Sequence, residues 1–423
     1  MRNRSTYIVI FLLLSLISYL ISQSDYFEGD IRRRENQLFG FIDKRGVFVI
    51  KPSFLNADSF MEGLAAVQTG SRCNTLRCLR AKACKEYDKE YVWGFINNKG
   101  QMVIKPRFHM VSGFSEGMSV VLYGDNCLER RCKWGYIDKT GRMLIHPQFY
   151  DASPFSEGLA FVNKSKKCRD DLYSCEYNYI NKKGEIVING RFKSARAFST
   201  GLAAVETCDS SFVCKWGFID KSGKTIIDPR YYDVLSGFSE GLAAVRITDP
   251  LDGDGKAGFI NSAGEIVIKP KFCTAGIFSF GLASVSICDD CRNSVGCKWG
   301  FINKSGAYVV QPRFDTNERF TEGLAPFTIY FTGFGFFDVK GNVAIKPAYL
   351  YAKNFSEGLA AVSIVEKKTH KTFFGRVIST YSSKIGYIDK SGRMVIKPRA
   401  FREAGFFHDG LAAVMPCEYS DCR

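Results

Sequence analysis

The stretch Gly201–Gly223, GLAAVETCDSSFVCKWGFIDKSG, contains two short runs of β-forming residues on either side of a polar segment. We expect Leu-Ala-Ala-Val and Lys-Trp-Gly-Phe-Ile-Asp to pair as an antiparallel hairpin. In that register Val205 lies opposite Gly217 and Cys208 lies opposite Cys214. The closing Asp-Lys-Ser-Gly favours a type I turn, which takes Asp at its first position and Gly at its last.

This stretch belongs to a unit that the chain repeats nine times. Two positions mark each copy, both glycine except at Asn178, and they are 23 residues apart in seven copies and 24 apart in two. The first elements are Phe39-Gly40, Trp93-Gly94, Trp134-Gly135, Tyr177-Asn178, Trp216-Gly217, Ala257-Gly258, Trp299-Gly300, Phe334-Gly335 and Ile385-Gly386. The second glycines are Gly63, Gly117, Gly158, Gly201, Gly241, Gly281, Gly323, Gly358 and Gly410. The distance from each second glycine to the first element of the next copy varies from 12 to 31 residues. Insertions therefore fall in the one kind of surface loop that lies between them.

Two further segments complete the unit. A third strand such as Met102–Pro106 ends at a proline in every copy except the one that contains Asn189. Proline has no N–H to donate, so ladder pairing ends there. A short fourth segment carries two aromatic residues, such as Phe108 and Phe114, before the Ser-Glu-Gly turn. Four short strands in about 41 residues are typical of a β-propeller blade.

The chain ends indicate how the repeats are arranged. The repeats begin in mid-unit at Phe39-Gly40 and finish with the complementary half at Asp409–Val414. If the hairpin lies within one blade, the last segment pairs with the first and removes the sheet edges. With 46% hydrophobic residues, the chain is long enough and apolar enough to fold. We therefore predict an all-β fold, a nine-repeat β-propeller-like ring of four-strand units, with an open β-solenoid as the alternative.

The recurrent phrases WGFIDKSG, VIKPRF and FSEGLAAV resemble the tryptophan-glycine (WG or KWG) repeat family of bacterial proteins over residues 39–416. The resemblance implies a repeat architecture and an interaction role, and it implies no catalytic residue or cofactor. The tryptophan is absent at Tyr177-Asn178, Ala257 and Ile385. We expect a structural, core-packing role for Trp93-Gly94, Trp134-Gly135, Trp216-Gly217 and Trp299-Gly300.

The N-terminal segment has the features of an export signal. Arg2 and Arg4 precede an apolar run, and Ser22-Gln23-Ser24 offers small residues for cleavage. We expect residues 1–24 to be a signal peptide, or an uncleaved anchor, followed by a basic linker at 25–38 and the nine repeats at 39–423. A lipoprotein anchor is excluded because the first cysteine is Cys73.

Fifteen cysteines in an exported chain point to structural disulfides. Most lie in the variable hairpin loops, where a bridge orders an inserted loop. The candidates are Cys127, Cys132, Cys168, Cys175, Cys208, Cys214, Cys288, Cys297, Cys417 and Cys422. The pairing of Cys73, Cys78, Cys84, Cys273 and Cys291 stays open, and an odd total leaves one thiol free or paired outside the chain. The alternative to disulfides is a zinc site at Cys288-Asp-Asp-Cys291. The four histidines, however, show no spacing typical of zinc ligands.

Other chemical patterns are weak. The Glu of the Ser-Glu-Gly phrase recurs in six copies but belongs to a turn, which favours a structural role. The acids around Asp252 lack the spacing of a calcium loop, and His109 and His146 are expected at the surface. No nucleophile elbow, phosphate loop or zinc-protease motif is present. We predict no catalytic, cofactor or metal residues.

The net charge of +15 bears on the partner. Export argues against nucleic acid, and contact with a membrane is expected only through an uncleaved N-terminal segment. All variable hairpins should lie on one face, with the two longest, the loops Gln68–Val92 and Ser363–Lys384, near each other. Their basic residues make an acidic protein or glycan the expected partner: Arg72, Arg77, Arg80, Lys82, Lys367, Lys368 and Lys371. The predicted function is binding at the cell envelope or outside the cell, and the alternative is an enzyme acting on wall or surface polysaccharide.

Overall fold

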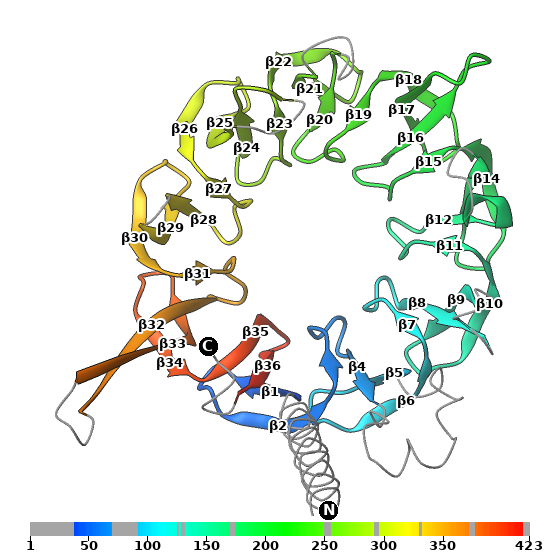
Figure 1. Cartoon of the computed structure of the whole chain (residues 1–423). Helices are drawn as coiled ribbons and strands as arrows, with labels where there is room; N and C mark the ends of the chain where they lie inside the picture. The colour runs from blue at the N-terminus through cyan, green and yellow to red at the C-terminus, as the bar shows by residue number, and fades with distance from the viewer. Residues whose placement is uncertain are drawn as a thin grey trace, which may run out of the picture.

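The computed structural model describes residues 38–69, 92–124, 127, 132–169, 174–248, 255–291, 296–329, 332–371 and 377–417. Within them the strands form nine four-stranded antiparallel sheets, which stand as blades around a ring (Figure 1). We number blades 1 to 8 in chain order from β3 and name the strands of each blade A to D from the centre outward. The prediction of a nine-blade, propeller-like ring is confirmed.

Strand A is the innermost strand of each of the nine blades, and it is two residues long in all of them except the ninth. These innermost strands are β3 (Asn56–Ala57), β7 (Met110–Val111), β11 (Asp151–Ala152), β15 (Ser194–Ala195), β19 (Asp233–Val234), β23 (Thr274–Ala275), β27 (Thr316–Asn317), β31 (Tyr351–Ala352) and the longer β35 (Phe401–His408). The B strands are β4 (Ala65–Thr69), β8 (Met118–Tyr123), β12 (Ala160–Asn163), β16 (Leu202–Cys208), β20 (Leu242–Arg246), β24 (Leu282–Ile287), β28 (Leu324–Ile329), β32 (Leu359–Lys371) and β36 (Leu411–Pro416).

Strand C carries the tryptophan-glycine element, and strand D lies at the outer rim. The C strands are β1 (Phe39–Asp43), β5 (Val92–Ile96), β9 (Lys133–Asp138), β13 (Tyr177–Ile180), β17 (Cys214–Asp220), β21 (Ala257–Asn261), β25 (Lys298–Asn303), β29 (Gly333–Asp338) and β33 (Val377–Asp389). The D strands are β2 (Phe48–Phe54), β6 (Met102–Phe108), β10 (Met143–Phe149), β14 (Ile186–Phe192), β18 (Thr225–Tyr231), β22 (Ile266–Phe272), β26 (Tyr308–Phe314), β30 (Val343–Tyr349) and β34 (Met394–Arg399). One short 3-10 helix, η2, spans Lys166–Arg169.

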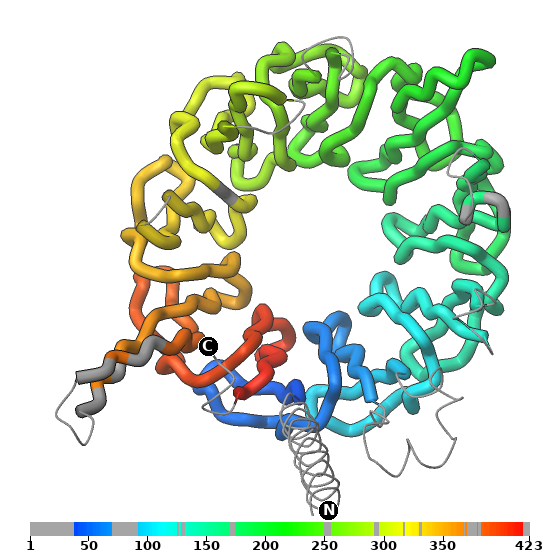
Figure 2. Tube along the Cα trace, viewed as in Figure 1, coloured from blue at the N-terminus to red at the C-terminus, as the bar shows by residue number. Residues whose placement is uncertain are grey.

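The ninth blade is built from both ends of the chain. Its sheet has the order β2-β1-β36-β35, and Gly40 pairs with Val414 while Ile42 pairs with Ala412. The trace in Figure 2 shows the first and last coloured segments side by side. Since the last strands hold the first, the ring is closed and does not form an open solenoid.

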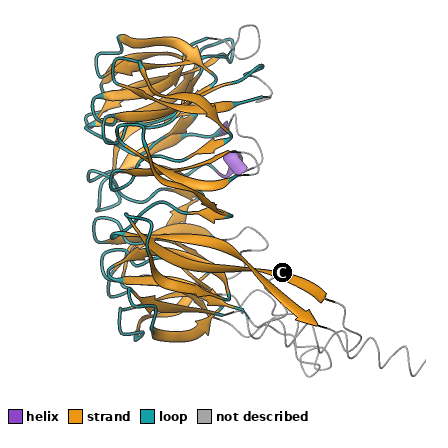
Figure 3. Ribbon diagram, turned by 90° about the vertical axis from the view of Figure 1, so that its left-hand side faces the viewer, coloured by secondary structure: helices purple, strands orange, loops and turns teal. Residues whose placement is uncertain are grey.

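The register within the hairpins follows the sequence prediction. Val205 lies opposite Gly217 and Cys208 lies opposite Cys214 in the β16–β17 ladder. The turn that follows β17 is closed by a hydrogen bond from the Gly223 N–H to the Asp220 carbonyl at 2.9 Å. Alternating strand connections place the A–B and C–D turns on one side of the ring, which we call the turn face. The B–C hairpins and D–A corners lie on the other side, the hairpin face (Figure 3).

The hydrophobic core lies between blades. One cluster joins Phe218 and Ile227 of blade 4 to Phe238 and Val245 of blade 5, and the other clusters repeat this plan. Each joint holds an aromatic pair with ring centroids 4.8 to 5.1 Å apart. Such pairs prefer edge-on or offset geometry and add to the burial energy. The blades are therefore stabilised mainly by their neighbours.

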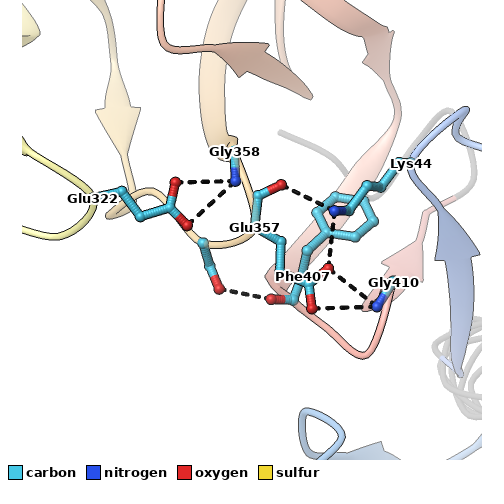
Figure 4. Close-up of polar contacts among 7 residues, drawn as sticks. Lys44, Glu322, Glu357, Gly358, Phe407 and Gly410 are labelled. Atoms are coloured by element: carbon cyan, nitrogen blue, oxygen red, sulfur yellow. Dashed lines mark hydrogen bonds and ion pairs between the residues drawn. The ribbon is translucent and has the colours of Figure 1, made fainter.

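Polar contacts on the turn face also join neighbouring blades. The Glu357 carboxylate accepts a hydrogen bond from the Gly410 N–H at 3.1 Å and pairs with Lys44 at 3.0 Å (Figure 4). We call this arrangement the inter-blade clasp. It recurs as Glu62–Gly117–Lys139, Glu116–Gly158–Lys182, Glu157–Gly201–Lys221, Glu240–Gly281–Lys304 and Glu322–Gly358–Lys390. The recurring glutamates thus hold the ring together.

The copies that lack the clasp glutamate also lack its lysine. Thr200 is followed in the next blade by Ser262 at the lysine position, and Phe280 is followed by Val339. Asp409, whose side chain is shorter, still accepts a hydrogen bond from the Gly63 N–H at 3.0 Å. Because both partners change together within one chain, the two residues act as a pair.

Substitution Glu157→Gln should lower the free energy of unfolding at pH 7 by about 1 kcal/mol, because an exposed ion pair and one charged hydrogen bond weaken. Burial acts to raise the pKa of Glu157, but Lys221 and the Gly201 N–H outweigh it and hold that pKa below 4.5. A lowered folded-state pKa gives stability that is present above pH 4.5 and lost as the pH falls further. In urea melts, the difference in unfolding free energy between the native chain and the variant should therefore be larger at pH 7 than at pH 3. A native–variant difference in unfolding free energy that does not change with pH would contradict the clasp. Lys221→Met, alone and combined with Glu157→Gln, completes a double-mutant cycle.

Candidate functional site

The hairpin face carries the variable part of each repeat. The eighth hairpin, Ser363–Lys384, was expected to be an inserted loop, but most of it is β-structure. Strands β32 and β33 pair over thirteen residues each, from Leu359↔Asp389 to Lys371↔Val377. This two-stranded ribbon projects from the hairpin face (Figure 3), since its Val, Ile, Thr and Tyr residues favour extended backbone.

The basic residues predicted for partner binding are only partly within the described chain. Arg72, Arg77, Arg80 and Lys82 lie outside the described residues. Lys367, Lys368 and Lys371 lie in β32, and of these the structure describes the Lys367 side chain, which is exposed. The first and eighth hairpins belong to the two blades that flank the closing blade, as the predicted ring requires.

Disulfides close the hairpins. Cys127–Cys132, Cys168–Cys175, Cys208–Cys214 and Cys288–Cys297 are bonded, with Cα–Cα distances of 3.9 to 4.8 Å. Cys417 is also disulfide-bonded, and Cys422 lies outside the described residues, as do Cys73, Cys78 and Cys84. Each bridge orders a loop where an insertion would otherwise fray the strand ends.

The sequence left Cys273 and Cys291 unassigned, and the structure joins them with a Cα–Cα distance of 4.8 Å. Cys273 occupies the corner that enters blade 6, directly after β22, and Cys291 lies in the hairpin of that blade. The D–A corner and the hairpin open on the same face, so the corner lies within reach of the loop. That shared face is the signal that sequence reasoning overlooked.

A cavity of about 570 Å³ lies on the hairpin face where blades 3 and 4 meet. We call it the joint cavity, and it is lined by Cys175, Tyr177, Lys193, Ser194, Glu206, Phe212 and Cys214. Two disulfides, Cys168–Cys175 and Cys208–Cys214, hold its walls. The repeat pattern gives no reason to group Tyr177, Lys193, Glu206 and Phe212.

The polar lining of the joint cavity is shaped by its neighbours. Burial raises the pKa of the Glu206 carboxyl, the nearby Asp233 raises it further, and Arg196 opposes both. The Tyr177 hydroxyl donates a hydrogen bond to Asp151 at 2.7 Å, and burial together with this bond raises the pKa of Tyr177. The cavity therefore combines a fixed phenol with a partly desolvated carboxylate.

Comparison with known proteins identifies the repeat. A family model described as WG containing repeat matches residues 39–73, 93–127, 134–168, 179–207, 216–249, 258–287, 299–329, 334–367 and 385–415. The chain belongs to the WG-repeat family. No curated protein matches this chain. The WG-repeat fold and its nine-copy organisation support a repeat protein with a binding role.

Solved structures resemble the WG-repeat ring in fold. A eukaryotic initiation factor is 11% identical with a TM-score of 0.53, over 91% of this chain and 100% of that chain. The β-propeller domain of the Trilobed protease from Pyrococcus furiosus is 9% identical with a TM-score of 0.39, over 82% and 99%. Citrobacter koseri AztD is 12% identical with a TM-score of 0.34, over 72% and 90%. At 11% identity the likeness to the initiation factor concerns the fold alone.

The WG-repeat residues have defined positions. Trp216 is buried in an inter-blade cluster, while Trp93, Trp134 and Trp299 are half-buried against equivalent clusters. A Cβ added to Gly217 would lie 2.5 Å from the Ile227 carbonyl oxygen; Gly94, Gly135 and Gly300 have equivalent contacts. The glycine is therefore required by the close approach of strand D.

The lysine of the Lys-Trp-Gly phrase contacts the D–A corner. Lys133 lies over the Tyr150 ring at 5.0 Å, and Lys298 pairs with Asp315 at 2.6 Å. In blade 3 the phrase becomes Glu176-Tyr177-Asn178, and the corner residue is the cavity-lining Lys193. The repeat thus departs from its pattern beside the joint cavity.

One group of potential metal ligands lies in the described part of blade 2. His109, Cys127 and Cys132 have ligand atoms within 4.8 Å of one another, but the two cysteines are joined in a disulfide and present no thiolate. His146 is exposed on β10, and Asp252 of the calcium-like loop lies outside the described residues. Among the described residues, no helix is both long and apolar enough to cross a membrane.

Proposed function

We propose that this WG-repeat ring is an exported, non-enzymatic protein that binds a protein or glycan partner at the cell envelope or outside the cell. The observation that carries the proposal is the division between its faces. The turn face repeats one set of clasps, whereas insertions, disulfides and the joint cavity are on the hairpin face. A constant scaffold with one variable face is the usual arrangement of a binding surface.

Export is supported by the disulfides. Five bridges among the described residues suit an oxidising compartment, and the N-terminal segment has the composition of a signal. N-terminal sequencing and thiol titration of protein recovered outside the cytoplasm test this part of the proposal. A predominance of free thiols in that protein would contradict it.

The β32–β33 ribbon is the element that we expect to contact the partner. An isolated two-stranded ribbon is at best marginally stable in water, so a partner that covers it would add stability. Its B strand carries Lys367, Lys368 and Lys371, and the chain has a net charge of +15. These charges favour an acidic partner.

Replacing residues 366–382 with Asn-Gly should remove the outer ribbon and keep its base, because Val365 and Ser383 are paired. We expect binding to polygalacturonate, an acidic glycan, and capture of envelope proteins to weaken at least about tenfold. Biolayer interferometry measures both. The melting temperature should not change. Lys99→Gln, which removes an exposed charge from the turn face, is the matched control; equal binding by the ribbon variant and the native chain would place the site elsewhere.

The second candidate is an enzyme acting on wall or surface polysaccharide. Its support is Glu206, a half-buried residue that lines the joint cavity. Burial raises the pKa of its carboxyl, as suits a general acid in glycoside hydrolysis. Release of reducing ends that Glu206→Gln abolishes would favour this function over binding alone.

A further inference from the structure

We infer that the joint cavity between blades 3 and 4 binds an uncharged saccharide unit. This inference rests on the proposed binding function and adds to the ribbon a second, separate site with its own ligand class. The cavity volume of about 570 Å³ falls in the range that small-molecule sites occupy. Its walls are fixed by two disulfides, so little conformational entropy is lost when a ligand enters.

Two aromatic rings of different character line the cavity. Tyr177 is held in place by its hydrogen bond to Asp151 and by an edge contact with Phe161 at 5.7 Å between centroids. Phe212 is 78% exposed and has a positive φ of 61°. The turn that carries it is closed by hydrogen bonds from the Ser211 and Val213 N–H groups to Asp209.

Phe212 has no evident role in the fold. A left-handed backbone disfavours a bulky side chain and suits glycine, and an exposed phenyl ring gains nothing from burial. Phe212 nevertheless belongs to the lining of the joint cavity. A ligand with an apolar face would cover it, and the C–H face of a sugar ring has that property.

Polar residues line the cavity as well. Glu206 is half-buried, and its carboxylate forms no hydrogen bond with the described part of the chain; Arg196 and Asp233 act on it electrostatically. Ser194 and Lys193 belong to the same lining, and Lys193 has a charge opposite to that of Glu206. A lining with one cation and one anion favours a ligand without net charge, and sugar hydroxyls can donate to the carboxylate.

A peptide fits the cavity less well. Strand β16 is paired on both sides, with β15 and with β17. Its backbone groups are therefore occupied and offer no edge for an added strand. Recognition depends on side chains, as for a saccharide that presents an apolar face and hydroxyls.

The repeat indicates why this joint is distinct. In blade 4 the equivalent lysine, Lys215, lies over the Tyr232 ring and covers the corner. In blade 3 Glu176 replaces that lysine, and Lys193 replaces the corner aromatic. Asn178 replaces the glycine, which the structure accommodates with Gly190 in place of proline and a positive φ of 48° at Arg191. These departures lie in the blade that forms one wall of the cavity.

The test uses the full mature chain with maltotriose, cellotriose and chitotriose as uncharged probes and trigalacturonate as a charged one. Titration calorimetry should detect binding of an uncharged trisaccharide. Phe212→Gly should weaken it at least about tenfold through loss of the stacking surface, while the melting temperature stays equal or rises because glycine suits the positive φ. Glu206→Gln should weaken it as well. Val213→Ala, a change at an exposed neighbour outside the lining, is the matched control.

Binding by Phe212→Gly and Glu206→Gln at native strength would overturn the assignment of the cavity. Failure of all three uncharged probes to bind, or binding of trigalacturonate alone, would overturn the ligand class. The ribbon variant without residues 366–382 should keep its saccharide affinity. If that variant loses the envelope partner while no uncharged probe binds the native chain, the proposed function stands and this inference fails.

Discussion

Deleting residues 407–423 should release the first strand of the chain from its sheet and lower the free energy of unfolding by about 5 kcal/mol or more. Strand β36 pairs with β1 from Gly40↔Val414 to Asp43↔Leu411. The deletion also removes Phe407, whose ring lies 4.9 Å from that of Tyr387. Blades 8 and 9 therefore lose their shared core.

Urea unfolding and hydrogen exchange measure this effect. Amides in Phe39–Asp43 should lose protection in the deletion variant. Truncation after Pro416 is the control, since it keeps the whole of β36 and removes only Cys417 and the residues beyond it; exchange of β1 should change far less than in the longer deletion. Full protection of β1 in the longer deletion would show that the first strand does not depend on the last.

The second large effect is expected at the tryptophan-glycine element. In Gly217→Ala the added Cβ would lie 2.5 Å from the Ile227 carbonyl oxygen and 2.8 Å from the Pro229 nitrogen. Both atoms belong to backbone, so strand D must move and the β17–β18 ladder must distort. We expect a loss of about 3 kcal/mol or more.

Gly237→Ala makes the same chemical change where space is available. The nearest atom to its added Cβ is the Cβ of Ser199 at 3.7 Å, an ordinary contact distance. Urea melts should show the native free energy of unfolding for this control. Equal stability of the two variants would contradict the role assigned to the glycine.

The hairpins and the ring were predictable because their signals are local or periodic. Side chains in a strand alternate with a period of two, so the positions of Cys208 and Cys214 fixed one register. The split repeat indicated closure because Phe39-Gly40 lacked its partner segment. A turn role for Glu157 could also be inferred from its neighbours in the sequence.

The contacts between blades were less accessible to sequence reasoning. Glu157 pairs with Lys221 of the next blade at 3.0 Å, and only the joint loss of both residues in other copies reveals the pair. The Cys273–Cys291 bridge depends on a corner and a hairpin sharing one face. The joint cavity lies where blade 3 departs from the repeat. Sequence reasoning relied on residues that the copies share, so it gave no prediction for residues that differ in a single copy.

Closure of the ring is tested most directly by native-state hydrogen exchange of the intact chain. The comparison is between β1 (Phe39–Asp43) and β17 (Cys214–Asp220), which are both third strands of a blade and paired on both sides. A closed ring predicts comparable protection of the Gly40–Ile42 and Gly217–Ile219 amides, with exchange only through global unfolding. Rapid exchange of β1, as in a frayed terminal strand, together with slow exchange of β17 would contradict the closed nine-blade ring.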